Sequence, residues 1–255
     1  MRHSFYQLRE ESLTTCTRPF NARGSIVKRC PQCHLALFAC LCPWQITRTS
    51  GIRFILIVHR KELYKTTNTG RLIADLLPES TSAFLWSRTE PDAQLLTEIA
   101  HPSRRVVLLF PESQANMGEK QPDKIATPAT KKEAKHEKPL TVILLDGTWK
   151  QASRMANLSG WLKNIERHPI ASSSIIENQN NYIRKAPQKY QLSTAQAAAC
   201  ILREFNDSQN ANLLEHYFSV FNQHCIATRR NVTPTISDSH NVLTQAKSNA
   251  NDTTA

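Results

Sequence analysis

The sequence predicts one α/β domain with a mostly parallel sheet and helices on both faces, preceded by a small cysteine-rich module. Short continuous apolar runs recur along the chain, and such runs are typical of strands that are buried on both faces. Helical stretches separate these runs, and this alternation indicates a parallel sheet. The length of 255 residues and the hydrophobic fraction of 40% suffice for one ordinary core with tails.

Each element has its own signal. The apolar runs place strands at residues 53–58, 83–86, 106–110 and 140–145, with a weaker candidate at 171–176. The helical stretches fall at residues 70–77, 91–100, 148–162, 194–205 and 213–221. Pro78 stops the first of these helices, Pro91 opens the second, and Ser193 is placed to cap the fourth.

Three stretches lie outside this pattern. Residues 1–29 are irregular and basic, and residues 114–138 form a polar insertion that we expect to be mobile. Residues 228–255 are rich in Asn, Thr and Ser and are expected to form a disordered tail. The main α/β domain would then span residues 45–227, after a cysteine module at 30–44.

Charge and composition narrow the class of protein. The net charge of +11 favours a polyanionic partner, although an unremarkable basic surface is the alternative. The chain has no apolar run long enough to span a bilayer and no signal peptide, so we expect a soluble cytoplasmic protein with no membrane partner. Its six glycines form neither GxGxxG nor GxxxxGKS/T, which argues against a Rossmann dehydrogenase or a P-loop kinase.

Four of the seven cysteines form two close pairs, Cys30-Pro-Gln-Cys33 and Cys40-Leu-Cys42. Two such pairs can close a tetrahedral sulfur site, which suits zinc. Four thiolates leave no open coordination position, so this zinc would be structural. The alternative is a set of buried or free thiols, since disulfides are rare in the cytoplasm.

The turn Asp146-Gly147-Thr148-Trp149 follows the apolar run at 140–145. Ligands of open α/β sheets bind at the carboxyl ends of the strands, where Asp146 would lie. Gly147 lets the backbone bend, Thr148 can cap the following helix, and Trp149 can stack on a base. The alternative is a structural turn with Asp146 as a helix cap and Trp149 in the core.

This turn, continued by Gln151, Ala152 and Met155, resembles the signature of the DTW-domain family. The four-cysteine spacing and further segments of the chain match the same family: Glu62, Asn68-Thr69-Gly70-Arg71-Leu72, Trp86-Ser87-Arg88-Thr89-Glu90-Pro91, Phe110-Pro111, Tyr182-Ile183-Arg184-Lys185 and Ser193-Thr194-Ala195. The resemblance covers roughly residues 15–225 and is closest to the bacterial tRNA-uridine aminocarboxypropyltransferases. Two departures are Gln196, where many relatives have Glu, and the long insertion.

The resemblance implies transfer of the 3-amino-3-carboxypropyl group of S-adenosylmethionine to N3 of a tRNA uridine, in the variable loop, with release of methylthioadenosine. S-adenosylmethionine would be the cosubstrate, zinc a structural metal and tRNA the partner, with no stable protein partner inferred. The resemblance also implies a SPOUT-like sheet with a trefoil knot, which periodicity cannot show and which is rare among folds in general.

The expected site residues fall into three groups. The catalytic group comprises Asp146, Thr148 and Trp149, with Asp146 either the base that accepts the uridine N3 proton or an anchor for the cofactor. The cofactor-binding group comprises Asp146, Gly147, Thr69, Gly70, Arg71, Ser193 and Thr194. The RNA-binding group comprises Arg88, Arg184 and Lys185, for which solvated surface charges are the alternative.

Two rival functions remain open at this point, and a third possibility is the same transferase acting on ribosomal RNA. An RNA methyltransferase would use the same cofactor but release S-adenosylhomocysteine. A non-enzymatic zinc RNA-binding protein would bind tRNA without binding S-adenosylmethionine.

Overall fold

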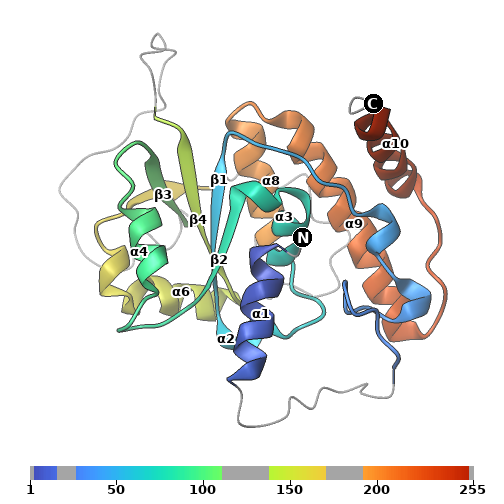
Figure 1. Ribbon diagram of the computed structural model, residues 1–255, viewed down its shortest axis with the longest axis horizontal. Helices are drawn as coiled ribbons and strands as arrows, with labels where there is room; N and C mark the ends of the chain where they lie inside the picture. Colours follow the sequence, from blue (N-terminus) through green and yellow to red (C-terminus); the bar gives the residue numbers. More distant parts are fainter. Residues whose placement is uncertain (1–2, 16–26, 111–137, 171–191, 253–255) are drawn as a thin grey trace.

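The computed structural model describes residues 3–15, 27–110, 138–170 and 192–252 of the chain. In these residues a five-stranded, all-parallel sheet forms the centre of the molecule, with the strand order β2-β1-β4-β3-β5 (Figure 1). The strands are β1 (Arg53–Val58), β2 (Thr81–Leu85), β3 (Arg105–Phe110), β4 (Leu140–Asp146) and β5 (Glu166–Pro169). The prediction of an α/β fold with a parallel sheet is confirmed.

Helices cover both faces of the sheet because the central strands are apolar on both sides. In β1, Phe54 and Leu56 belong to one core cluster, while Ile55 and Ile57 belong to the other. The first cluster packs against α3 (Gly70–Leu76), α8 (Thr194–Glu204) and α9 (Ser208–Arg230). The second packs against α4 (Ala93–Ile99) and α6 (Trp149–Leu158), on the opposite side in Figure 1.

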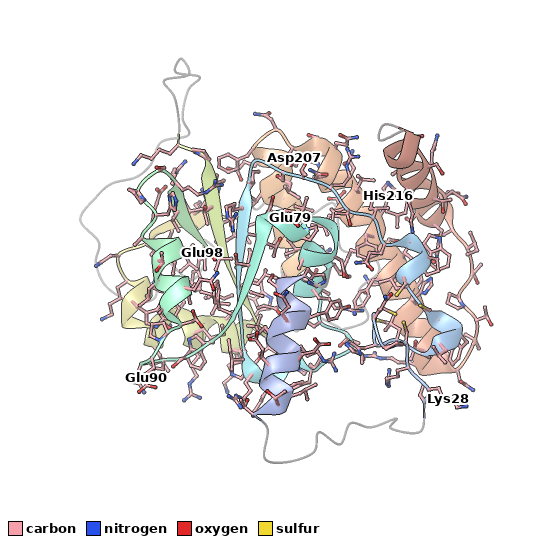
Figure 2. The ribbon with its side chains drawn as sticks, viewed as in Figure 1. Lys28, Glu79, Glu90, Glu98, Asp207 and His216 are labelled. Carbon is pink, nitrogen blue, oxygen red and sulfur yellow. The ribbon has the colours of Figure 1, made fainter. Side chains whose placement is uncertain are left out.

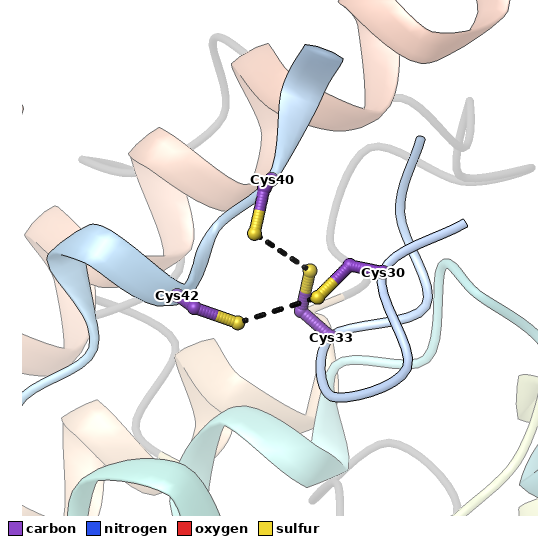
Figure 3. Close-up of side chains that lie close together, drawn as sticks. All are labelled: Cys30, Cys33, Cys40 and Cys42. Carbon is purple, nitrogen blue, oxygen red and sulfur yellow. Dashed lines mark hydrogen bonds between the residues drawn. The ribbon is translucent and has the colours of Figure 1, made fainter. Parts of the chain in front are cut away.

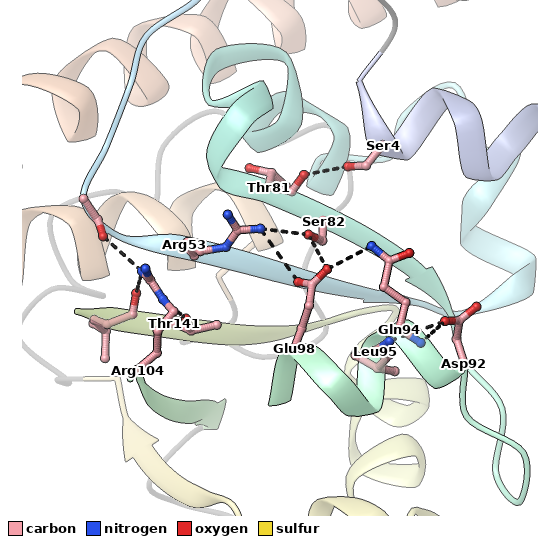
Figure 4. A network of polar contacts seen from close by, with 12 residues as sticks. Ser4, Arg53, Thr81, Ser82, Asp92, Gln94, Leu95, Glu98, Arg104 and Thr141 are labelled. Carbon is pink, nitrogen blue, oxygen red and sulfur yellow. Dashed lines mark hydrogen bonds and ion pairs between the residues drawn. The ribbon is translucent and has the colours of Figure 1, made fainter. Parts of the chain in front are cut away.

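A polar network fixes α4 to the edge strand β2 and to its neighbour β1 (Figure 4). Asp92 caps the helix by accepting from the backbone N–H groups of Gln94 and Leu95, at 2.8 and 3.3 Å. Glu98, near the other end of α4, accepts a 3.0 Å bond from the Ser82 hydroxyl of β2. Arg53 of β1 donates to the same hydroxyl, so the helix and both strands share one set of contacts.

The sequence located the main strands and helices but not all of their ends. The helix expected at 213–221 is the middle of α9, which runs from Ser208 to Arg230 and keeps Cys225 and Ala227 buried near its end. The short strand β5, with the sequence ERHP, was not anticipated because it is polar and lies at the sheet edge. The remaining short elements are α2 (Arg60–Leu63), η1 (Leu37–Ala39), η2 (Cys42–Trp44), η3 (Pro78–Ser80) and η4 (Gly160–Leu162).

The prediction that residues 1–29 are irregular is wrong for α1 (Ser4–Thr14). This helix lacks a strong apolar stripe, but Phe5 is 1% exposed and joins the larger core. Polar contacts complete its attachment: the His3 ring lies 2.8 Å from Asp75, and the Ser12 hydroxyl lies 2.7 Å from that of Tyr64.

The prediction of a disordered tail is wrong for α10 (Asp238–Asp252), which packs against α9. Leu243 is fully buried, and His240 is bonded to His224 of α9 through their Nε2 atoms, at 3.0 Å. The polar composition of this segment concealed a helix that a few specific contacts hold in place.

Some expectations fall on other parts of the chain. The weak strand candidate at 171–176, and the insertion at 114–138 apart from Lys138, lie outside the described residues. The trefoil knot stays a prediction. Among the described residues, no helix is both long and apolar enough to span a membrane.

Candidate functional site

Asp146 ends β4 at the carboxyl edge of the sheet, directly beside Val58 of β1. Its side chain is 3% exposed, and both carboxylate oxygens accept hydrogen bonds. One oxygen accepts from the amide of Asn68, in the loop before α3. The other accepts from the hydroxyl of Thr194, at the start of α8, at 2.7 Å. Asp146 therefore joins three separate segments at one point.

Gly70 lies so close to Asp146 that no side chain would fit between them. A Cβ atom at this glycine would lie 2.8 Å from the Asp146 carboxyl carbon. Asn68 reinforces the approach, because its Oδ1 accepts from the Arg71 backbone N–H at 3.1 Å. The Asn68–Gly70 loop is thus shaped around the carboxylate, and the Thr69 and Gly70 predicted to bind a cofactor are brought beside Asp146.

Thr148 caps α6, as the sequence predicted. Its hydroxyl accepts from the backbone N–H of Gln151, and the Gln151 side chain accepts in return from the Thr148 N–H at 2.7 Å. Trp149, at the first position of the helix, is half-buried. The end of the turn is therefore fixed to the first turn of α6 by the two hydrogen bonds between Thr148 and Gln151.

Ser193 and Thr194 open α8 with a second capping box. Gln196 accepts from the Ser193 N–H at 3.0 Å, while the Ser193 hydroxyl accepts from the Gln196 N–H. An amide oxygen makes this bond as a carboxylate would, so Gln196 keeps the cap intact although it lacks the charge of Glu. The cap leaves Thr194 in position to donate to Asp146.

His59 is a site residue that the sequence analysis missed. It follows β1 as Trp86 follows β2, and the two rings stack with centroids 5.9 Å apart. Its Nδ1 accepts from the Lys61 backbone N–H and lies 3.3 Å from the Gln151 amide nitrogen. Burial lowers the pKa of His59, which favours the neutral ring at pH 7. The available signal was its place directly after a buried strand.

The four clustered cysteines converge as predicted (Figure 3). Their sulfur atoms all lie within 4.8 Å of one another, with Cys30 and Cys42 at 3.7 Å and Cys33 and Cys40 at 3.8 Å. Four ligands at the usual zinc–sulfur distance of about 2.3 Å in a tetrahedron would be about 3.8 Å apart, so the donor set fits zinc.

The surroundings of Cys33 lower the pKa of its thiol and so favour the thiolate. A hydrogen bond from Cys42 is the main factor that lowers the pKa of Cys33 to about 4, and backbone N–H groups and the Arg71 charge contribute further. Metal ligands must be deprotonated, so this shift favours binding.

Arg71 does not lie where the sequence analysis expected it. Its side chain is 2% exposed and donates to the Cys33 backbone carbonyl at 2.6 Å and to the Tyr6 hydroxyl at 2.8 Å. The guanidinium also lies over the ring of Phe221. These contacts direct the side chain toward the cysteine module, and they do not suit the expected role in binding the cofactor.

Of the three expected RNA-binding residues, the structure describes one, Arg88. Arg88 is exposed in the segment after β2, beyond Trp86. Arg184 and Lys185, like Tyr182, lie outside the described residues.

The geometry thus defines an α/β protein with a buried carboxylate at the carboxyl edge of a parallel sheet and a four-cysteine cluster that could hold a metal ion. A family model described as the DTW domain matches residues 27–226. The chain therefore belongs to the DTW domain family, as the resemblance indicated. A comparison with solved structures finds no match.

Proposed function

We propose that this protein transfers the 3-amino-3-carboxypropyl group of S-adenosylmethionine to N3 of a uridine in tRNA and releases methylthioadenosine. The observation that carries the proposal is the DTW domain match over residues 27–226, a family generally associated with this activity. The variable loop is the expected position of the uridine. The net charge of +11 supports a nucleic-acid substrate.

The carboxyl edge of the sheet suits the cofactor. The ends of β1, β2 and β4 meet there, and the amino end of α8 joins them through the bond from Thr194 to Asp146. Helix amino ends favour anionic groups, and S-adenosylmethionine carries a carboxylate on the group to be transferred. Transfer requires that the aminocarboxypropyl carbon, rather than the methyl group, face the nucleophile.

Asp146 is better suited to shaping this site than to accepting the uridine proton. A general base must come within hydrogen-bond reach of the proton that it removes. Asp146 is 3% exposed, and both oxygens already accept from neighbouring side chains. We therefore assign it a positioning role, in which it sets the Asn68–Gly70 loop against the start of α8.

His59 can supply a hydrogen-bond donor to the uracil. Because its Nδ1 accepts the Lys61 N–H, the neutral ring carries its proton on Nε2. That N–H can donate to a uracil oxygen as the N3 proton passes to water and negative charge develops on the imide, which is the stage at which a donor helps most.

The test incubates purified protein with unmodified tRNA and S-adenosylmethionine, followed by mass spectrometry of nucleosides and small products. Methylthioadenosine together with aminocarboxypropyl-uridine is expected. Release of S-adenosylhomocysteine would instead identify a methyltransferase, and binding of tRNA without consumption of S-adenosylmethionine a binding protein.

Two carboxylate-to-amide variants make a matched pair for this assay. Asp146→Asn should lose product formation. Glu79→Gln should keep it, because Glu79 is exposed on η3, just before the amino end of β2 (Figure 2).

A further inference from the structure

A cavity of about 240 Å³ lies between α1 and the cysteine module. It is lined by side chains of α1 and its cap, including His3, Tyr6 and Arg9, and by the module residues Pro31, Gln32 and His34. None of the residues that shape Asp146 lines it. The cavity is therefore separate from the Asp146 site.

Arg9 is the cation of this cavity, and it has no anionic partner among the described residues. Its Nε atom is buried without a hydrogen-bond acceptor. Burial is the main cause that lowers the pKa of Arg9, and the charge of Arg71 lowers it further. A partly buried charge without a partner is unfavourable, so retaining it points to a ligand of opposite charge.

Arg9 is not needed to balance the negative charge of the cysteine site, because two other arginines contact the module. A zinc ion with four thiolates carries two negative charges in excess, and two other arginines adjoin it. Arg71 donates to the Cys33 carbonyl, and Arg29 donates to the His34 carbonyl at 3.1 Å. Glu10 is the only carboxylate among the residues that line the cavity.

His3 gives a second, independent sign of a missing partner. It lines the cavity, is 8% exposed, and its Nδ1 is buried without a hydrogen-bond partner. Its other nitrogen is held by Asp75, which also accepts from Gln45 and Tyr217. The unpaired Nδ1 of His3 is therefore available to a ligand that enters the cavity beside Arg9.

We propose that this cavity binds a backbone phosphate of the RNA substrate, with Arg9 as the principal cation. The inference rests on the proposed function and deepens it, since it adds an RNA contact at the α1–cysteine module cleft, apart from the Asp146 site. Exposed Lys28, two residues before the module, adds a further positive charge next to it (Figure 2). A guanidinium suits this role because it presents several donors to phosphate oxygens in a fixed plane.

The test measures tRNA binding by fluorescence anisotropy over a range of salt concentrations. Arg9→Gln should weaken binding at low salt about ten-fold and reduce the slope of log affinity against log salt by about 0.9, the value for one phosphate contact. Arg9→Lys should retain the slope. Arg105→Gln removes one positive charge from β3, where Arg105 is paired with Glu166, and should leave binding unchanged.

Thermal unfolding separates this role from a structural one. Because Arg9 has no described partner, Arg9→Gln should leave the Tm unchanged or raise it; a lowered Tm accompanying the weaker binding would overturn the inference. If the wild type modifies tRNA, and the Arg9→Gln and Arg105→Gln variants bind tRNA with the same affinity, this inference fails while the proposed function stands. If the wild type does not bind tRNA, the proposed function fails with it.

Discussion

At the scale of single residues, Asp146 is notable because its contacts are complete within the protein. The carboxylate accepts from Asn68 and Thr194, and Gly70 approaches it closely. A side chain held in this way fixes the relative positions of β4, the loop before α3 and the start of α8. The assigned positioning role and the alternative role as a base make different predictions for stability and for cofactor binding.

Replacing Asp146 with Asn should destabilise the protein and weaken cofactor binding together. The new amide would direct N–H groups at a neighbouring donor, either the Asn68 amide or the Thr194 hydroxyl. Leaving a buried donor without an acceptor costs about 1–3 kcal/mol. Thermal unfolding and calorimetry with S-adenosylmethionine measure the two effects. A variant with unchanged Tm and cofactor affinity but no turnover would instead identify Asp146 as the base.

Gly70→Ala tests the same contact from the opposite side. The added methyl group would lie 2.8 Å from the Asp146 carboxyl carbon, so the loop or the carboxylate must shift. Overpacking of this kind typically costs about 1–3 kcal/mol. Gly51→Ala is the control, since no atom lies within 4 Å of the position of its Cβ. Equal Tm and equal cofactor affinity in the two variants would show that the close approach has no function.

At the scale of elements, α10 is expected to be separable from the rest of the fold. It packs against α9 and η2, and Leu243 and His240 are its buried side chains. Leu243→Ala should cost about 2–5 kcal/mol locally and undock the helix. Hydrogen exchange should rise in α10 while protection in β4 stays the same. Val242→Ala, next to it and only partly buried, should change exchange little. Loss of protection in β4 would mean that α10 supports the whole core.

The elements show which features the sequence could predict. The strands β1 and β4 were predictable because burial on both faces requires continuous apolar runs such as Phe54–Val58. Helices α1 and α10 were not, because polar contacts such as His3 with Asp75 and His240 with His224 secure them. Such contacts join residues far apart in the chain and leave no periodic pattern.

The same distinction applies to the candidate site. Asp146 and Thr148 could be predicted because strand ends and helix caps have local sequence signals. The true surroundings of Arg71 could not, since its contacts with Tyr6 and Cys33 come from segments that the fold brings together. The sequence analysis therefore expected Arg71 to bind the cofactor, whereas its side chain contacts the cysteine module.

At the scale of the whole molecule, Arg71 connects the cysteine module with the Asp146 site. Its side chain donates to the Cys33 carbonyl, while its backbone N–H donates to Asn68. Asn68 in turn donates to the Asp146 carboxylate. A continuous set of hydrogen bonds therefore links the expected zinc site to the carboxyl edge of the sheet.

Removal of zinc should accordingly weaken S-adenosylmethionine binding as well as stability, although no cysteine of the module contacts Asp146. Without the metal, the loop that carries the Cys33 carbonyl loosens, and the buried guanidinium of Arg71 loses its fixed acceptor. Cys42→Ser should lower the zinc content below one per chain, the Tm and the cofactor affinity. Cys200→Ser is the matched control, because Cys200 is buried in α8 outside the cluster, and burial raises its pKa to about 11. Metal analysis, thermal unfolding and calorimetry on both variants measure these effects. Full cofactor affinity in folded, zinc-free Cys42→Ser protein would show that the module stabilises its own segment and that the hydrogen bonds through Arg71 and Asn68 transmit nothing to the site.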